Sequence, residues 1–359
     1  METRIIKVDE KGPVFSEEEE LLLREAGSVI KEGGLVAFPT ETVYGLGGDA
    51  FNRESSHKIY AAKGRPSDNP LIVHINDMDG LFRVAAKVTR EAEKIAEAFW
   101  PGPLTMILPK AEDVPLETTG GLQTVAVRMP SHPVARKLIE YGGGFIAAPS
   151  ANTSGKPSPT VAKYVIEDMS GRIEMIIDGG EVGIGLESTI IDLTVSPPQI
   201  LRPGYITEEM LEQVLGQVDT DRTILSNDSG LAPKAPGMKY RHYAPKGDLT
   251  IVEGENSEVI SYINSQAQAY QAAGHKVGVI GSRESWEAYH ADTVKDAGSR
   301  QDEQEIARNL YRILREFDDE EVDIIFSEAF DSNGMGQAIM NRLLKAAGHK
   351  VVYVSGKDA

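Results

Sequence analysis

The chain has 359 residues, a formal net charge of −18, 41% hydrophobic and 26% charged residues, and no cysteine. This composition is typical of globular proteins, and the length favours two domains. Without cysteine, the chain cannot use disulfides, thiolate catalysis or cysteine-ligated zinc or iron–sulfur sites. The negative charge argues against broad electrostatic binding to nucleic acid or anionic membranes. An anionic substrate would therefore need a local cluster of Lys and Arg.

Hydropathy and the N-terminal sequence bear on location. No stretch approaches the roughly 20 consecutive apolar residues that are needed to span a bilayer. The sequence METRIIKVDEKG at the N-terminus lacks the apolar centre of a signal peptide. We therefore expect a cytoplasmic protein without membrane association.

The first half of the chain alternates between helix and strand patterns. Ser16 is a good N-cap with Glu19 three residues later, which predicts a capping box at the start of a helix over 16–33. The apolar run 35–38 predicts a buried strand, and Pro39 ends its ladder pairing and begins a polar loop. The elements predicted next are helices at 55–63, 89–99 and 133–141, strands at 71–75, 104–108, 124–128, 145–148 and 173–178, and a β-rich run after Ser188.

Helix and strand patterns fade between residues 218 and 247. We interpret 218–247 as a linker between a domain at 1–217 and a second domain at 248–359, because loops this long are uncommon inside compact domains. Beyond the linker, strands and helices alternate, which predicts a small parallel Rossmann-like α/β domain. The predicted elements are strands at 249–252, 277–280, 322–326 and 351–354, and helices at 258–273, 302–317 and 336–347.

Several common catalytic motifs are incomplete or missing. The stretch SANTSGKP at 150–157 resembles a P-loop but lacks its first glycine, and proline follows the lysine. No GxGxxG, GxSxG or HExxH pattern is present, and the seven histidines lack metal-ligand spacing. A P-loop NTPase, a serine hydrolase and a zinc protease are therefore not supported.

Six polar segments in the first domain instead share one chemical character. Each combines hydroxyls or cations with Gly or Pro at or near a strand end, where open α/β sheets bind ligands. Any one of them could be an ordinary turn with a solvated charge, but together they predict an oxyanion or phosphate pocket. Alternation along 124–128 places Thr124 and Arg128 on one face, and Arg128 could bind a carboxylate or phosphate bidentately. The segments are PTET at 39–42, KGRPSDN at 63–69, Thr124 with Arg128, SANTSGKPSPT at 150–160, Glu187 with Ser188, and Arg202.

These segments resemble a known family. PTETVYGLG, KGRP followed by NPL, SANTSGKPSPT and ESTI are similar to the pattern of YrdC-type L-threonylcarbamoyladenylate synthases. The stretches SGLAPKAPGMKYRHYAP and GMGQAIMNRL resemble the longer, two-domain members, so the resemblance covers nearly the whole chain. It implies a YrdC-like catalytic domain with a twisted, open mixed sheet, helices and a concave pocket, joined to the Rossmann-like domain.

The resemblance also implies a reaction and its partners. Such enzymes condense L-threonine, bicarbonate or CO₂, and ATP into threonylcarbamoyl-AMP and pyrophosphate. Mg²⁺ is expected to enter with ATP, held by phosphate oxygens and water rather than by dedicated protein ligands. The product passes to a separate tRNA threonylcarbamoyl transferase for N6-threonylcarbamoylation of adenosine 37. Tight tRNA binding is not expected of this acidic chain, and no residue is assigned as a nucleophile or as an acid or base.

The resemblance assigns the ligand-binding residues by motif position. The expected L-threonine contacts are Thr40, His74, Arg128, Ser150 and Ser188. The expected ATP contacts are Lys63, Arg65, Ser67, Thr124, Asn152, Thr160, Arg202 and Tyr243. Glu41 receives no role, since it could orient either the loop or the substrate ammonium.

The linker and the function each have alternatives. Residues 234–245, with Tyr240, Arg241, His242 and Tyr243, match a segment that implies a lid over the catalytic cleft, although Tyr243 could equally anchor the linker as a hydrophobic contact. A second hypothesis for the function is an RNA-binding or ribosome-maturation factor that uses the same basic pocket. A third is a carbamoyl-transfer domain of the hydrogenase-maturation type, which the absence of zinc-finger cysteines disfavours.

Overall fold

The computed structural model of the chain describes residues 1–9, 14–221 and 242–354. Its contacts divide the chain into two compact units. The first comprises Met1–Ser154 and Ser158–Tyr240, and the second comprises Gly155–Pro157 and Arg241–Ala359. Residues 155–157, at the tip of the predicted 150–160 loop, are therefore grouped with the second unit. The expected domain bounds of 1–217 and 248–359 place these residues in the first domain.

The first unit is built on a mixed sheet with the strand order β1-β8-β2-β3-β7-β4-β6-β5-β9-β10-β11. The sheet contains parallel pairs such as β4 with β6 and antiparallel pairs such as β5 with β6. The described strands are β1 Arg4–Lys7, β2 Val36–Phe38, β3 Gly45–Asp49, β4 Ile72–Ile75, β5 Leu104–Pro109, β6 Thr124–Arg128, β7 Phe145–Ala148, β8 Met175–Asp178, β9 Thr189–Asp192, β10 Gln199–Arg202 and β11 Asp219–Thr220.

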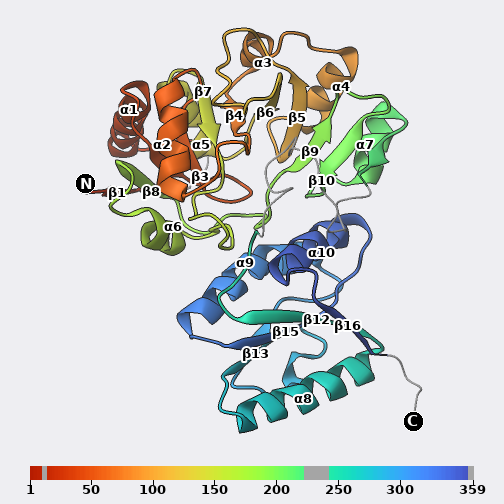
Figure 1. Cartoon of the computed structure of the whole chain (residues 1–359). Coiled ribbons are helices and arrows are strands. Elements are labelled where there is room, and N and C mark those ends of the chain that lie inside the picture. Colours follow the sequence, from red (N-terminus) through yellow and green to blue (C-terminus); the bar gives the residue numbers. More distant parts are fainter. Residues whose placement is uncertain (10–13, 222–241, 355–359) are drawn as a thin grey trace. The chain divides into compact units, whose positions relative to one another are not determined.

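Helices cover both faces of this sheet (Figure 1). Apolar side chains of α2, α3, α4, α6 and α7 form one core with one face. Those of α1 and α5 form a second core with β2, β7 and β8 on the opposite face. The described helices are α1 Glu17–Lys31, α2 Arg53–Lys63, α3 Met78–Val84, α4 Arg90–Phe99, α5 Pro133–Tyr141, α6 Ala162–Met169 and α7 Glu208–Leu215.

The predicted polar loop at 39–44 connects a tight hairpin. The strand β2 ends at Phe38, as Pro39 predicts, and β3 returns antiparallel to it, with Phe38 opposite Gly45. The glycines of β3 allow this close approach. A Cβ atom at Gly47 would lie 2.7 Å from Cγ2 of Ile146 and 2.9 Å from Cε1 of Phe38, which is closer than side chains pack.

The second unit is a parallel sheet with the strand order β14-β13-β15-β12-β16. The helix α8 lies on one side of it, and α9 with α10 lies on the other (Figure 1). The described elements are β12 Asp248–Gly254, α8 Asn256–Ala272, β13 Val277–Gly281, the 3₁₀ turn η2 Trp286–Ala288, β14 Thr293–Asp296, α9 Glu303–Asp319, β15 Ile324–Glu328, α10 Gly334–Ala346 and β16 Val351–Val354.

The predicted fold class is confirmed, with a mixed sheet in the first unit and an all-parallel sheet in the second. The capping box is also present, because the Glu19 amide donates to Oγ of Ser16 and the Ser16 amide donates to the Glu19 carboxylate. The strand β11 lies inside the range expected to be the linker. Within the described residues, no helix is long and apolar enough to cross a membrane.

Candidate active site

One cross-strand row brings predicted site residues together on a single face of the first sheet. In register, His74 on β4 lies opposite Arg128 on β6, and Arg128 lies opposite Thr105 on β5. The row continues through Ile190 on β9 to Arg202 on β10. Because directly opposite residues share a face, His74, Arg128 and Thr105 project to the same side. The register shifts between Ile200 and Arg202, and the contact of Arg202 with Ser188, which meets Thr105, brings the Arg202 side chain to this group. The site thus includes strand residues as well as the strand-end loops.

Arg128 lies at the centre of this row and is 4% exposed. Its Nη1 donates a hydrogen bond to Oγ1 of Thr42 at 2.9 Å. The Thr42 hydroxyl is 2.9 Å from that of Thr40, which in turn donates to the Val43 carbonyl at 2.7 Å. Since the Thr40 hydrogen is used there, Thr42 must donate to Thr40. This directed chain fixes the polar loop against the guanidinium.

Glu41 is the carboxylate beside Arg128. Its Oε1 lies 2.7 Å from Nη2 of Arg128, and the two side chains are 13% and 4% exposed. The contact is therefore a buried ion pair at hydrogen-bonding distance. Burial opposes ionisation of Glu41, but the guanidinium outweighs it and holds the pKa of Glu41 below its usual value.

His74 is neutral at physiological pH. Burial first, and the charge of Arg128 second, lower the pKa of His74 to about 3. Its Nδ1 lies 3.1 Å from the carbonyl oxygen of Ile72. A carbonyl can only accept, so Nδ1 carries the proton and Nε2 keeps a lone pair. The ring also meets Phe38 edge to face, with 6.2 Å between the centroids.

At the other end of the row, Ser188 connects Thr105 with Arg202. Its hydroxyl is 2.7 Å from Oγ1 of Thr105 and accepts from Nη2 of Arg202 at 3.2 Å. Nε of Arg202 donates to the Ser188 carbonyl at 3.0 Å. The predicted pair Ser188 and Arg202 is therefore in direct contact, although the two residues had been assigned to different substrates.

The loop that follows β7 is organised by Lys63 of α2. The buried Lys63 ammonium donates to the carbonyls of Ser150 and Asn152. The Ser150 hydroxyl donates to the Asn152 side chain, and the Ser154 amide donates to the Lys63 carbonyl. Lys63, Ser150 and Asn152 thus form one cluster, in which Lys63 bonds the loop backbone.

Backbone hydrogen bonds join the three ligand loops. The Tyr44 amide donates to the Pro159 carbonyl at 3.0 Å, and the Ile184 amide donates to the Glu41 carbonyl at 2.9 Å. The buried Ser158 hydroxyl donates to the Glu187 carboxylate at 2.6 Å. The polar loop at 39–44 therefore lies between the 150–160 and 181–188 segments.

The remaining predicted ATP residues of the first unit lie outside these contacts. Arg65 donates to the carbonyls of Asn69 and Pro70, and Ser67 is exposed. Thr124 begins β6 and Arg128 ends it, so the two share a face about 13 Å apart at the usual rise of a strand. The buried Thr160 hydroxyl has no hydrogen-bond partner among the described residues.

Tyr243 belongs to the second unit. It is 5% exposed, and its ring packs against Tyr311 of α9, with 5.2 Å between the centroids. These contacts fit the alternative role of Tyr243 as a hydrophobic anchor, and its contact with ATP stays a prediction. Tyr240 and Arg241 lie outside the described residues, and so does most of the segment expected to form a lid.

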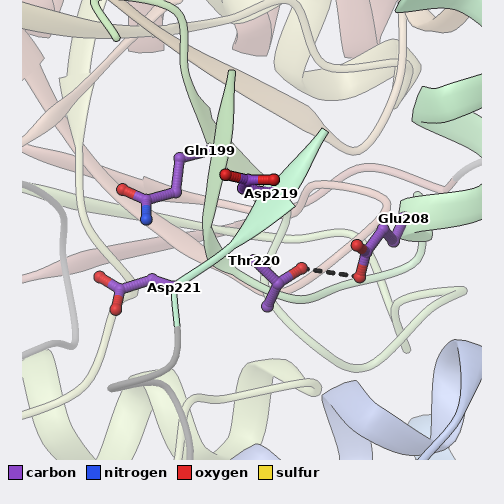
Figure 2. A pocket seen from close by; sticks show the side chains of 5 residues that line it. All are labelled: Gln199, Glu208, Asp219, Thr220 and Asp221. Carbon is purple, nitrogen blue, oxygen red and sulfur yellow. Dashed lines mark hydrogen bonds between the residues drawn. The ribbon is translucent and has the colours of Figure 1, made fainter. Parts of the chain in front are cut away.

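A separate pocket lies at the far edge of the first sheet (Figure 2). It has a volume of about 540 Å³ and is lined by Gln199, Glu208, Asp219, Thr220 and Asp221. Its three carboxylates would repel a polyphosphate, and none of the predicted ligand residues lines it. In the described ranges, no group of three or more His, Asp or Glu side chains is arranged to hold a metal ion.

Sequence reasoning missed two side chains that complete the row. Thr42 lies in the PTET segment without an assigned role, and Thr105 lies in the middle of an apolar strand. The alternation of Thr105 with Leu104 and Met106 was the available signal, because it places a hydroxyl on the face opposite the apolar core.

Comparisons with known proteins identify the family. One family model, described as "Telomere recombination", matches residues 28–204, and another, described as "Threonylcarbamoyl-AMP synthase, C-terminal domain", matches residues 206–348. The chain is 51% identical to the threonylcarbamoyl-AMP synthase of Pyrococcus abyssi, with 94% of this chain and 97% of the relative covered. It is 48% identical to the corresponding synthase of Bacillus subtilis, with 92% and 94% covered.

Solved structures agree with this assignment. The crystal structure of P. abyssi Sua5 complexed with L-threonine matches with a TM-score of 0.91 and 49% identity, over 98% of this chain and all of that one. The resemblance that the sequence motifs indicated is thereby confirmed. The chain belongs to the family of two-domain threonylcarbamoyl-AMP synthases, which are nucleotidyltransferases.

Proposed function

We propose that the chain joins L-threonine, bicarbonate or CO₂, and ATP into threonylcarbamoyl-AMP and releases pyrophosphate. The observation that carries this proposal is the cross-strand row, in which two buried arginines share one sheet face with hydroxyls and a neutral histidine. Such a surface suits two substrates that bear a carboxylate and a polyphosphate. The relative crystallised with L-threonine is consistent with it.

L-Threonine would bind at the Arg128 end of the row. The Arg128 guanidinium would donate hydrogen bonds to the substrate carboxylate, and Thr40, Ser150 and Ser188 would supply hydroxyls around it. The neutral His74 offers a lone pair at Nε2, which can accept a hydrogen bond from the ammonium or the hydroxyl of threonine. Threonine would thus be held by groups that do not themselves react.

ATP would lie beside threonine, against the second group of predicted residues. Lys63 and Arg202 are the buried cations of that group, and their bonds to Ser150, Asn152 and Ser188 place both next to the threonine contacts. The shared face of β6 runs from Arg128 to Thr124 with the small Ala126 between them. This face offers a path along which the nucleotide can extend.

The chemistry needs positioning more than a reactive side chain. The threonine ammonium loses one proton to solvent, and the amine attacks CO₂ to form a C–N bond while one C–O π bond opens. Loss of a second proton from the nitrogen to solvent gives the carbamate. A carbamate oxygen then attacks the α-phosphorus of ATP, and the bond to the β-phosphate bridge breaks so that pyrophosphate leaves. Such transfers depend on alignment and charge stabilisation, which Arg128, Arg202 and Lys63 can provide.

Magnesium would enter with ATP. It would supply positive charge that neutralises the polyphosphate, held by phosphate oxygens and water. The product would pass to a separate tRNA threonylcarbamoyl transferase, so this acidic chain need not bind tRNA tightly.

Pyrophosphate release tests the proposal directly. We expect release when ATP, L-threonine, bicarbonate and Mg²⁺ are all present, and loss of release when threonine or bicarbonate is omitted. Threonine-independent release would refute the assignment. RNA affinity that falls steeply with salt, without pyrophosphate release, would favour the RNA-binding alternative.

A further inference from the structure

Glu41 has no assigned role, although it is the charged group nearest to the proposed threonine contact. Its carboxylate lies 2.7 Å from Nη2 of Arg128, and both side chains are at least 87% buried. Nη1 of Arg128 donates to Thr42 and Nη2 faces the Glu41 carboxylate, whereas Nε has no hydrogen-bond partner among the described residues. A buried guanidinium with unused donors is suited to receive a further carboxylate.

Glu41 is held in place from several sides. Its carbonyl accepts from the Ile184 amide at 2.9 Å, and the next carbonyl, that of Thr42, accepts from the Gly185 amide at 3.0 Å. The Thr40 hydroxyl accepts from the amides of Thr42 and Val43. These bonds fix the Glu41 backbone beside Arg128, and the 2.7 Å ion pair holds its carboxylate there.

The pair sets the net charge at this end of the site. Glu41 and Arg128 cancel one another, and His74 is uncharged. A zwitterionic amino acid adds one charge of each sign, so the buried site stays neutral when it binds. A carboxylate without an ammonium group would leave one uncompensated negative charge in a buried site, which is costly.

We propose, on the basis of the proposed function, that Glu41 is a positioning residue. Its carboxylate is the permanent counter-charge of Arg128 and orients the guanidinium for the substrate carboxylate. As a result, this end of the site selects an amino-acid zwitterion over a simple carboxylate anion. Glu41 acts through Arg128 and takes no part in bond formation.

The test compares two ligands of nearly the same shape. L-Threonine and 3-hydroxybutyrate, which lacks only the amino group, are titrated calorimetrically into the wild-type chain and into the Glu41→Gln variant. In the wild type we expect 3-hydroxybutyrate to bind at least ~10-fold more weakly than threonine. In Glu41→Gln we expect threonine to bind ~10-fold or more weakly while 3-hydroxybutyrate binds as well or better, so that selectivity collapses.

Kinetics separate positioning from a purely structural role. In Glu41→Gln, KM for threonine should rise ~10-fold or more while KM for ATP stays within ~2-fold. Glu41→Asp keeps the charge and should restore part of the selectivity. The matched control is Glu54→Gln, an exposed carboxylate in the first turn of α2, which removes the same charge without effect. Equal changes in both KM values, or an unchanged ligand ratio, would overturn the inference.

A double-mutant cycle tests whether Glu41 acts through Arg128, and the charge-retaining Glu41→Asp variant keeps the inference testable if Glu41→Gln folds poorly. The Arg128→Gln variant removes the guanidinium, so replacing Glu41 in that background should barely change threonine affinity further. Additive losses would show that Glu41 acts independently of Arg128 and would contradict us. If the wild type neither binds threonine nor releases pyrophosphate, the proposed function is wrong. If the wild type does both, but Glu41→Gln leaves the ratio of threonine to 3-hydroxybutyrate affinity unchanged, only the inference about Glu41 is wrong.

Discussion

Acidification should weaken the first unit through His74. The ring is 4% exposed, and its pKa is lowered to about 3 by burial and by Arg128, whereas an unfolded histidine titrates near 6.5. Between these values the unfolded chain binds a proton that the folded chain does not, so the free energy of unfolding falls as pH falls. The contribution is complete above the unfolded pKa and lost progressively below it. At pH 5 the loss is about 2 kcal/mol.

The measurement compares His74→Gln with the wild type. Glutamine cannot titrate, and its amide can still donate to the Ile72 carbonyl that now accepts from His74. With Trp286 in the second unit replaced by Phe, the fluorescence of the largely buried Trp100 reports unfolding of the first unit alone. Urea unfolding is measured at pH 7.5 and pH 5.0.

We expect the wild type to lose about 2 kcal/mol more than His74→Gln between the two pH values. Carboxylates elsewhere titrate equally in both chains, so the difference isolates the histidine. The control is His57→Gln, at an exposed position on α2, which should follow the wild type. Parallel losses in the wild type and His74→Gln would refute the reasoning.

Three further substitutions test packing, capping and loop anchoring. Gly47→Ala places a Cβ 2.7 Å from Ile146 and should lower the free energy of unfolding by about 1–3 kcal/mol in urea titration; no change would contradict this. Ser16→Ala removes the cap shared with Glu19 and should lower the same quantity by about 1 kcal/mol, with KM values unaffected. Lys63→Met leaves two loop carbonyls without their donor and should raise KM for ATP. An unchanged KM for ATP would argue against a role of Lys63 in ATP binding.

Local signals in the sequence were sufficient for some elements that contain their own stabilising contacts, although the capped helices α3, Met78–Val84, and α7, Glu208–Leu215, were not predicted. The capping box of α1 is formed by residues three apart, and it is present as predicted. The apolar stripe of α9, with Ile306, Leu310, Ile313 and Leu314, is buried as its spacing indicates. In such elements the stabilising interactions join residues within one or two helical turns of each other, so they can be recognised from the sequence.

Elements defined by distant partners were missed. The strand β3, Gly45–Asp49, has almost no β-forming residues, and it exists because it pairs with β2 and β7. Its glycines are required by the neighbouring Phe38 and Ile146 side chains, so tertiary packing overrides local propensity. The edge strand β14, Thr293–Asp296, is short and only partly buried, and it was missed for a related reason.

The candidate site shows the same limit at the level of register. Motif positions identified His74, Arg128 and Arg202 individually, but no sequence pattern gives the pairing that aligns them. A shift of one residue in β5 would place Thr105 on the apolar core side and break its contact with Ser188. The row therefore depends on strand register, which is set by contacts between residues far apart in the chain.

The two ends of the proposed site differ in how completely their side chains are already bonded. At the threonine end, Arg128 and Thr40 are fixed by short hydrogen bonds within the first unit, so little ordering remains when threonine binds. At the ATP end, Lys63 and Arg202 are also bonded, but Ser67 is exposed and the Thr160 hydroxyl lacks a partner among the described residues. We therefore expect L-threonine to bind in calorimetry without nucleotide, with an affinity within ~10-fold of that measured beside a non-hydrolysable ATP analogue. If threonine bound only in the presence of the analogue, ATP would be needed to assemble the threonine end. The geometry of Arg128 in the absence of nucleotide would then be insufficient to hold the amino acid.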